Sequence, residues 1–489
     1  MATTAAAMMR VRRDVWKMSK AGSWDPDLLW YAKAVEAMKK KPLDDPLGWR
    51  YQAAIHEYRR ASDPFSNPTD LLPSQSDQDD FWGQCQHGSW YFLPWHRMYL
   101  LHFERIVADT VVQLGGPADW ALPYWNYSDK SNPDAMKLPP EFIAATLPDG
   151  TANALSIPQR AAVQPDGDFG LTALEVDIKG CLNEDEFEDS AIGTSSGFGG
   201  EKTGFVHNGA YPGVLEITPH GDVHGAVGGL GGFMGRFSTA ALDPIFWLHH
   251  ANIDRLWQVW RDRNAKHLDP VDTDWLTPVG IKFSFHDALG NVVIHAPTDV
   301  ADTSVALLSY RYEDVSDPFP AALAAGALVG GGSTVSKANQ PAEMVGATAA
   351  VALGAAPVTA SIALSKPSGP VSLAAGGDPL RVYLNFENIT AKQVTGGYVV
   401  YVEPAGDALT HKGLVAGTLP MFGVVEATSR QSPHGGSGLS YALDITEIVN
   451  AMESKHQWDP NNLRVRVEPI REAPSNSGLK IGRISVFYR

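Results

Sequence analysis

The chain has 489 residues, of which 44% are apolar, so it is long enough for two or three domains with sizeable cores. Its formal net charge of −16 argues against nucleic acid or an anionic membrane surface as the main partner. Two cysteines cannot form a disulfide framework, and no stretch reaches the roughly 18 apolar residues of a membrane helix. The N-terminal residues lack the apolar core of a secretory signal. We therefore expect a soluble, cytoplasmic protein that contacts no membrane.

Two amphipathic helices are predicted near the N-terminus, over residues 26–38 and 48–60, because both stretches place apolar side chains at helical spacing. His56 lies one position from the apolar face of the second helix. A single histidine in such a place is more often a core or surface residue than a metal ligand. His56 therefore gains a functional meaning only if further histidines accompany it.

The stretch CQHGSWYFLPWHRMYLLHFERIV, which begins at Cys85, supplies such histidines. Pro94 is expected to break any helix between His87 and His96, so that His87 lies in a loop and His96 in the first turn of a helix ending at residue 109. Both can point at one centre if the loop folds over the helix. The Cys85 thiol, two residues before His87, could be a metal ligand, a free buried thiol or a partner in a covalent link to the imidazole. Residues 129–200 are expected to be irregular, and the acidic run at 184–189 within them is expected to be a solvated loop.

A second group of histidines lies in LEITPHGDVHGAVGG and in ALDPIFWLHHANIDRLW. His220 and His224 are four residues apart, so a helix would place them on one face, which is a common grip for divalent metals. A further helix is predicted from residue 244, and on it His250 shares a face with Asp254, whereas His249 points about 100° away. We expect His250 to be the ligand and Asp254 to be a supporting carboxylate that holds the ligands by hydrogen bonds.

The histidines thus form two candidate sets of three, namely His56, His87 and His96, and His220, His224 and His250. Imidazoles without carboxylate or thiolate ligands suit copper or zinc rather than magnesium or calcium. Zinc takes four protein ligands in a structural site and three plus water in a catalytic one. Two three-histidine sites with open positions are typical of a dinuclear centre that binds a small molecule between its metals.

The motifs CxHGSWxFxxWHR with FER downstream, and LExxPHxxVH with MGRF and DPIFWLHHANIDRLW, resemble the two copper-binding regions of the type-3 copper proteins. Within that group they are similar to the tyrosinase and catechol oxidase (polyphenol oxidase) family. The resemblance spans residues 48–260 and implies two copper ions as cofactors. It implies copper A at His56, His87 and His96, and copper B at His220, His224 and His250. It also implies a thioether bond between Cys85 and His87.

Further positions carry over from the same resemblance. Glu216 matches the acidic residue that orients an active-site water, and Phe237 in MGRF matches a bulky gate residue over copper B. Tyr310 and Tyr312 resemble the Tyr-x-Tyr motif that closes the catalytic domain. Gly221 stands where members that hydroxylate monophenols well often carry asparagine, so we expect weak monophenol hydroxylation here.

The composition changes after residue 317. Residues 318–340 are rich in alanine and glycine, as in a flexible linker, and residues 341–489 alternate apolar and polar side chains without intervening helices. We predict a multidomain α + β protein with a mainly α-helical catalytic domain over 1–317 and an all-β sandwich or barrel over 341–489. The resemblance implies a four-helix-bundle dicopper core, and a C-terminal domain that covers the copper site and keeps the enzyme latent. Residues 419–422 are a candidate for the covering segment.

The expected function is the oxidation of o-diphenols (catechols) to o-quinones with O₂, restrained by the C-terminal domain. The partners would be phenolic small molecules and O₂, and a homo-oligomer is left open. Alternatives with the same centre are a tyrosinase with substantial monophenolase activity and an o-aminophenol oxidase. An oxygen carrier similar to molluscan haemocyanin is disfavoured by the single catalytic unit, and a protein with vestigial histidines by the presence of all six ligands.

Overall fold

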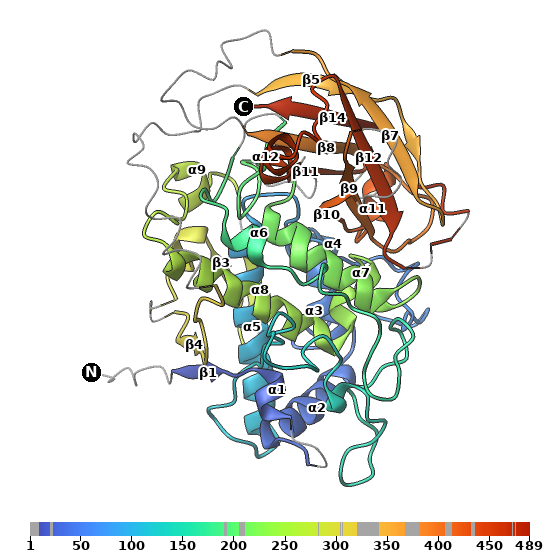
Figure 1. The fold of residues 1–489 in the computed structure, drawn as a ribbon. Coiled ribbons are helices and arrows are strands. Elements are labelled where there is room, and N and C mark those ends of the chain that lie inside the picture. Colours follow the sequence, from blue (N-terminus) through green and yellow to red (C-terminus); the bar gives the residue numbers. More distant parts are fainter. Residues whose placement is uncertain are drawn as a thin grey trace. The chain divides into compact units, whose positions relative to one another are not determined.

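The structure is a computed structural model, drawn in Figure 1. It describes residues 9–19, 23–189, 193–204, 211–281, 283–303, 305, 307–319, 342–366, 381–405, 413–431, 436–471, 473–474 and 476–489. The predicted linker at 318–340 lies outside the described residues from position 320 onward. Among the helices of the described ranges, none combines the length and the apolar character that a membrane crossing needs.

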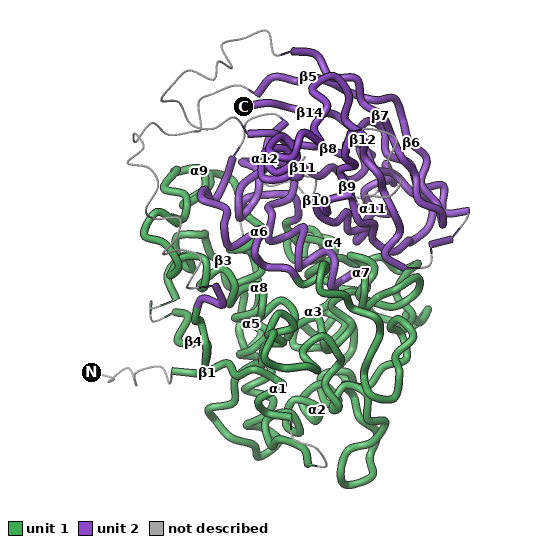
Figure 2. The backbone as a smooth tube through the Cα atoms, viewed as in Figure 1, with its two compact units in different colours: residues 1–86, 91–176, 226–316 green, residues 87–90, 177–225, 317–489 purple. Residues whose placement is uncertain are grey.

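The chain divides into two compact units, coloured separately in Figure 2. Unit 1 comprises Met1–Gln86, Tyr91–Val176 and Ala226–Ser316. Unit 2 comprises His87–Trp90, Asp177–Gly225 and Asp317–Arg489. Two segments that precede residue 317 in sequence therefore group with the C-terminal residues.

Unit 1 is mainly helical. Its helices are α1 (Val15–Met18), α2 (Pro26–Lys39), α3 (Trp49–His56), α4 (Gln75–Phe81), α5 (Phe92–Gln113), α8 (Pro244–Arg263) and α9 (Thr273–Leu276). The predicted starts of α2 and α8 are confirmed, because Asp25 and Asp243 each cap the helix through the side chain just before a proline. Helix α3 ends at His56, earlier than predicted.

Helix α5 begins at Phe92 and includes Pro94, so Pro94 does not break it, but His87 lies in the preceding loop and His96 near the start of the helix, as predicted. Pro94 is the third residue of the helix, where its missing N–H has no partner to lose within the helix. Helix α5 packs against α2 and α8. The four-helix bundle stays a prediction, because most of α7 (Asp222–Gly228), the helix of His224, belongs to unit 2.

Short strands complete unit 1. Strand β1 (Arg10–Arg12) pairs in parallel with β4 (Tyr310–Tyr312), which ties the N-terminal residues to the end of the unit. Strands β2 (Phe283–His286) and β3 (Val292–His295) form an antiparallel pair.

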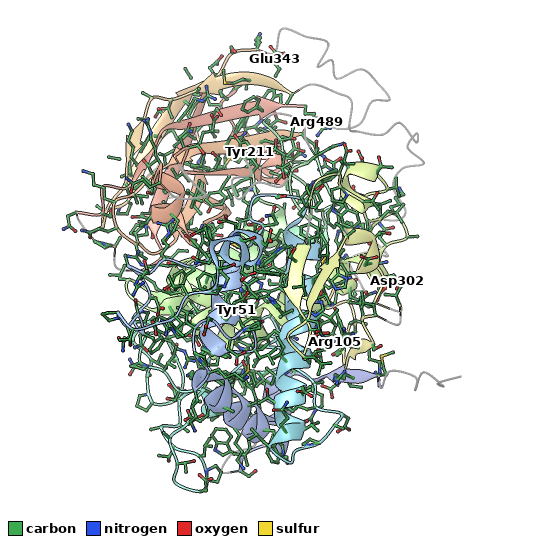
Figure 3. All side chains as sticks on the ribbon, turned by 180° about the vertical axis from the view of Figure 1, so that it is seen from behind. Tyr51, Arg105, Tyr211, Asp302, Glu343 and Arg489 are labelled. Atoms are coloured by element: carbon green, nitrogen blue, oxygen red, sulfur yellow. The ribbon has the colours of Figure 1, made fainter. Side chains whose placement is uncertain are left out.

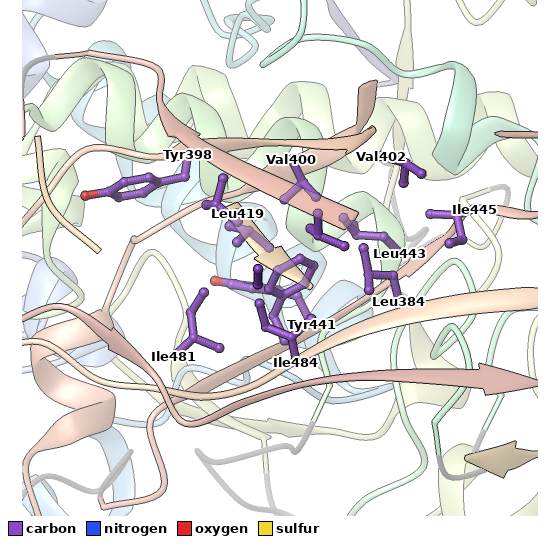
Figure 4. Close-up of a cluster of buried hydrophobic side chains, with 14 of the residues drawn as sticks. Leu384, Tyr398, Val400, Val402, Leu419, Tyr441, Leu443, Ile445, Ile481 and Ile484 are labelled. Atoms are coloured by element: carbon purple, nitrogen blue, oxygen red, sulfur yellow. The ribbon is translucent and has the colours of Figure 1, made fainter. Parts of the chain in front are cut away.

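Unit 2 contains two four-stranded antiparallel sheets, in the orders β10-β9-β12-β7 and β11-β8-β14-β5. The strands are β5 (Glu343–Ala347), β7 (Val358–Ala363), β8 (Val382–Ile389), β9 (Tyr398–Glu403), β10 (Leu414–Leu419), β11 (Leu439–Asp444), β12 (Asn462–Pro469) and β14 (Arg483–Tyr488). A small pair adds β6 (Val351–Ala352) and β13 (Lys480–Ile481). Their inward side chains form one apolar core, part of which is drawn in Figure 4. The expectation of strands without helices is wrong, since α11 (Val424–Thr428) and α12 (Thr446–Ser454) lie between them in sequence.

The acidic run at 184–189 is not a solvated loop, contrary to expectation. Asp185 lies 3.9 Å from Arg381, and Asp189 forms an ion pair with Arg489, which is labelled in Figure 3. Phe187 within the run is buried. The segment after α6 (Lys179–Leu182) is thus attached to strand ends of the C-terminal sheet within unit 2.

Candidate functional site

Three of the six predicted ligands lie together in unit 1. His56 ends α3, His96 lies in α5 and His250 lies in α8, and all three are buried. The ring centroids of His96 and His250 are 4.6 Å apart and the rings are stacked. The His56 ring centroid lies 5.8 Å from that of His96 and 6.5 Å from that of His250. Three helices thus bring together residues that are far apart in sequence.

Main-chain carbonyls fix the orientation of two of these rings. Nδ1 of His56 donates to the carbonyl oxygen of Phe237, and Nδ1 of His96 to that of Phe92, each over 2.8 Å. A proton on Nδ1 leaves the lone pair on Nε2, which is the arrangement that a metal ligand needs. Burial, together with the nearby His56 ring, holds the pKa of His96 well below its ordinary value, so the imidazole is neutral.

His249 and Asp254 lie on the same helix as His250, and the ring centroids of His249 and His250 are 5.2 Å apart. The His249 ring centroid is 5.7 Å from that of Tyr127. The prediction that Asp254 would hold the histidine ligands is wrong, because its oxygens accept hydrogen bonds from Arg97 (2.6 Å), Tyr310 (2.6 Å) and Tyr312 (2.5 Å). Asp254 fixes strand β4 and helix α5, and the two arginines beside it offset its burial and hold its pKa below the usual range.

Phe237 was expected as a gate over copper B. In the structure its ring centroid lies 6.3 Å from that of His56, a member of the copper A set, and its carbonyl oxygen accepts a hydrogen bond from Nδ1 of His56. The gate over copper B stays a prediction. The main-chain carbonyl of Phe237 thus helps to orient the His56 ring.

The other three predicted ligands lie together in unit 2. The ring centroids of His87 and His220 are 5.9 Å apart, and those of His220 and His224 are 4.7 Å apart. Both residues lie in one continuous helical run that follows the extended backbone of Thr218, as predicted: His220 in the π-helical turn η2 (Glu216–Gly221) and His224 in α7, which follows directly. The π turn orients His220, whose Nδ1 donates to the Glu216 carbonyl oxygen over 3.1 Å.

Glu216 holds the loop that carries His87. Both of its carboxylate oxygens accept from the Gly88 N–H, over 2.9 and 3.0 Å. Burial raises the pKa of Glu216 to about 8, and the Gly88 hydrogen bond opposes that rise. The same loop is tied to residue 203, because the Trp90 ring nitrogen donates to the Thr203 carbonyl oxygen over 2.9 Å. Glu216 thus supports His87 through its side chain and His220 through its main chain.

A C-terminal side chain covers the unit 2 histidines. The Phe422 ring stacks on the His224 ring with centroids 3.8 Å apart and planes 9° apart. It also meets the rings of His220 and His87 edge-on, at 5.8 and 6.0 Å. Phe422 belongs to the predicted covering segment at 419–422 and follows the end of strand β10.

A buried polar cluster joins the same parts of unit 2. Thr418 donates to Asp222 Oδ2 over 2.5 Å, and Thr218 donates to the same oxygen over 2.7 Å. Asp222 and Thr418 are buried. Sequence reasoning missed this cluster, because the spacing between residues 222 and 418 carries no signal that they meet.

Cys85 is fully buried, and its N–H donates to the His56 carbonyl oxygen over 3.4 Å. This hydrogen bond places Cys85 beside His56, the last residue of α3. The thioether to His87 stays a prediction.

Two family models match separate parts of the chain. Residues 46–263 match a family model described as the common central domain of tyrosinase, and residues 341–489 match a domain of unknown function. A tyrosinase from Hahella sp., HcTyr1, is 37% identical over 98% of this chain and 99% of its own length. A chloroplastic polyphenol oxidase from Vitis vinifera is 33% identical over 59% of this chain, and the match covers 46% of that protein.

Two solved structures share the fold over the whole length. The structure of latent apple tyrosinase has a TM-score of 0.62 at 23% identity and covers 100% of this chain and 99% of its own. The structure of a latent aurone synthase has a TM-score of 0.63 at 20% identity and covers 99% of this chain and 90% of its own. The likeness supports a helical core followed by a C-terminal β domain.

Proposed function

The chain belongs to the tyrosinase and polyphenol oxidase family, and on that premise we propose that it oxidises o-diphenols to o-quinones with O₂. In balanced form, two catechols and one O₂ give two o-quinones and two waters. The observation that carries the proposal is the set of six buried histidines, three in each unit, with three Nδ1 protons held by main-chain carbonyls. Weak monophenol hydroxylation accompanies this activity.

The cofactor is the dinuclear type-3 copper centre of the family. The residues fit it, because neutral imidazoles with Nε2 as the donor are suitable ligands for copper. We assign His56, His87 and His96 to copper A, and His220, His224 and His250 to copper B. Bound copper supplies O₂ binding and the transfer of two electrons from each diphenol.

The protein fixes the ligands and limits access. Carbonyls of Phe92, Glu216 and Phe237 hold three imidazoles in one tautomer, which avoids reorganisation during the reaction. The carboxylate of Glu216 holds the His87 loop, and orienting a water is its further proposed role. A phenol that stacked on His224 would need the place that the Phe422 ring takes.

We also propose that the C-terminal domain restrains activity. The division into a catalytic domain at 1–317, a linker at 318–340 and a β domain at 341–489 is part of this proposal. Its support is the Phe422 ring on His224 and the buried Thr418–Asp222 hydrogen bond. A latent chain then becomes active when the segment at 419–422 leaves the histidines.

The covalent link of Cys85 to His87 belongs to the same proposal. Formation of the thioether breaks the S–H bond of Cys85 and one imidazole C–H bond of His87, and O₂ as the two-electron oxidant would take up both hydrogens and leave as hydrogen peroxide. Its support is the two-residue spacing and the complete burial of Cys85. A tryptic peptide with an alkylatable Cys85 in fully active protein would contradict it.

The alternatives differ in substrate. A tyrosinase with substantial monophenolase activity is favoured by the likeness to the Hahella tyrosinase. Against it, Gly221 offers no side chain to help remove the proton of a monophenol. An o-aminophenol oxidase uses the same centre, and a haemocyanin-like oxygen carrier would bind O₂ without turnover. The cytoplasmic location and the oligomeric state stay predictions.

The test is a side-by-side assay of tyramine, 4-methylcatechol and an o-aminophenol, before and after cleavage in the 318–340 segment. We expect 4-methylcatechol to be turned over fastest and cleavage to raise its rate. Tyramine oxidised without a lag and as fast as the catechol would favour the tyrosinase. Absence of turnover with all three substrates in copper-loaded protein would favour the oxygen carrier.

A further inference from the structure

Gly221, between the predicted ligands His220 and His224, lies against the C-terminal segment of unit 2. A Cβ atom built on Gly221 would lie 2.9 Å from Cγ and 3.0 Å from Cβ of Pro420. Carbon atoms in contact are normally about 3.5–4.0 Å apart. The φ angle of Gly221 is outside the left-handed region, so the backbone itself would accept another residue. The next nearest atom, the Glu216 carbonyl oxygen, would lie 3.3 Å away, so the space beside Pro420 is what most requires glycine here.

Pro420 is held on both sides and cannot move away readily. Its carbonyl oxygen accepts a hydrogen bond from the buried hydroxyl of Tyr441 over 2.7 Å. Two residues before it, Thr418 is bonded to Asp222 over 2.5 Å, and Leu419 is fully buried in the core of the β domain. Phe422, two residues after it, stacks on His224. A side chain at position 221 would have to displace this whole segment.

We propose that Gly221 is a docking position for the covering segment, so that residue 221 sets both the phenol chemistry and the latency of the chain. A side chain at this position excludes Pro420 and releases Phe422 from His224. The substrate preference associated with residue 221 therefore cannot be changed in the intact chain without also changing how firmly the site is covered. This inference rests on the proposed restraint by the C-terminal domain.

The test compares Gly221→Ala with Gly225→Ala, which lies one turn further along the same stretch. A Cβ at Gly225 would meet nothing within 4 Å, so this variant is a matched control. The measured quantity is the latency ratio, defined as diphenol turnover after cleavage in 318–340 and removal of the C-terminal fragment, divided by turnover before it. Because each variant is compared with its own cleaved form, an effect of residue 221 on the chemistry cancels.

Gly221→Ala should lower the latency ratio toward one, by up to about tenfold, which is typical of one added methyl group in a packed site. Gly225→Ala should leave the ratio unchanged. In a Pro420→Gly background, which removes both contacting carbon atoms, Gly221→Ala should have no further effect. An unchanged ratio in Gly221→Ala, or an effect that persists in the Pro420→Gly background, would overturn the proposal.

Amide hydrogen exchange of the peptide covering 415–424 tests the contact between residue 221 and Pro420, and it requires neither turnover nor copper. We expect about tenfold faster exchange in Gly221→Ala than in Gly225→Ala and the wild type. Equal exchange in all three would overturn the docking contact. A wild-type chain that gains no activity on cleavage contradicts the proposed restraint instead, while faster exchange in Gly221→Ala would still support the contact.

Discussion

The two histidine groups differ in what surrounds their rings. In unit 1, the rings of His56 and His250 contact Phe246, a side chain of the same helical framework, at centroid distances of 5.3 and 4.1 Å. In unit 2, the His224 ring stacks against the ring of Phe422, which comes from the C-terminal residues. Each unit orients its imidazoles through main-chain carbonyls, but in unit 2 a second part of the chain also covers them. Holding the ligands and covering them are thus tasks of different residues.

The largest expected effect is the loss of a ligand from unit 1. His96→Ala should lower diphenol turnover by more than ~100-fold, since residues that only support metal ligands already cost 10–100-fold. Copper content measured by atomic absorption should fall from two ions to one per chain. His102→Ala is the control on the same helix, because His102 bonds His295 over 2.8 Å instead, and this variant should keep both ions. Retention of two coppers by His96→Ala would contradict its assignment.

The next effect concerns the cover in unit 2. Phe422→Ala should raise the turnover of the intact chain by about tenfold or more, because it removes a stacked ring pair and a buried aromatic side chain from the docked state. The turnover of the cleaved chain should not change. Val415→Ala, an exposed position on β10, is the control. Equal latency in Phe422→Ala and the control would mean that Phe422 does not restrain the enzyme.

A smaller effect is expected from the polar cluster beside the cover. Thr418→Val keeps the shape of the side chain but removes one buried hydrogen bond to Asp222, whose Oδ2 still accepts from Thr218, so the loss should be about 1 kcal/mol, as for a typical hydrogen bond. The latency ratio should fall by about fivefold in an assay with 4-methylcatechol. Thr359→Val, on the exposed face of β7, should leave the ratio as it is. An unchanged ratio in Thr418→Val would place the anchoring elsewhere.

The smallest expected effect is a change in how the stability of unit 1 depends on pH. It should leave the latency ratio unchanged. Burial raises the pKa of Asp14 from 3.8 to about 6, against the opposing Trp16 N–H. Because the folded pKa lies above the unfolded one, this group stabilises the fold most below pH 3.8, and that contribution is lost as the pH rises through about 6.

Asp14→Asn keeps a side-chain acceptor for the cap of α1 but cannot ionise. Its melting temperature should therefore fall less than that of the wild type between pH 4 and pH 6.5, as measured by scanning calorimetry. The latency ratio should be the same in both proteins. An identical pH dependence of melting would show that Asp14 does not titrate as expected.

Local patterns predicted much of unit 1 and less of unit 2. Asp-Pro pairs marked the starts of α2 and α8, and alternation marked the strands of the β domain, because these signals depend on near neighbours in sequence. The role given to Asp254 failed because helical spacing shows which face a carboxylate shares but not which arginines and tyrosines arrive there from residues 97 and 310–312. The spacing of His220 and His224 correctly predicted a shared helix but gave no sign of its π turn or of the extended Thr218 before it.

The grouping of Asp177–Gly225 with Asp317–Arg489 has a consequence for synthesis of the chain. His224 leaves the ribosome about 200 residues before Phe422, a delay of roughly 10–40 s at ordinary translation rates. Until then the C-terminal residues that pack against the 177–225 segment have not been synthesised, so unit 2 cannot fold completely. A nascent chain therefore passes through a stage in which its unit 2 histidines exist without their cover.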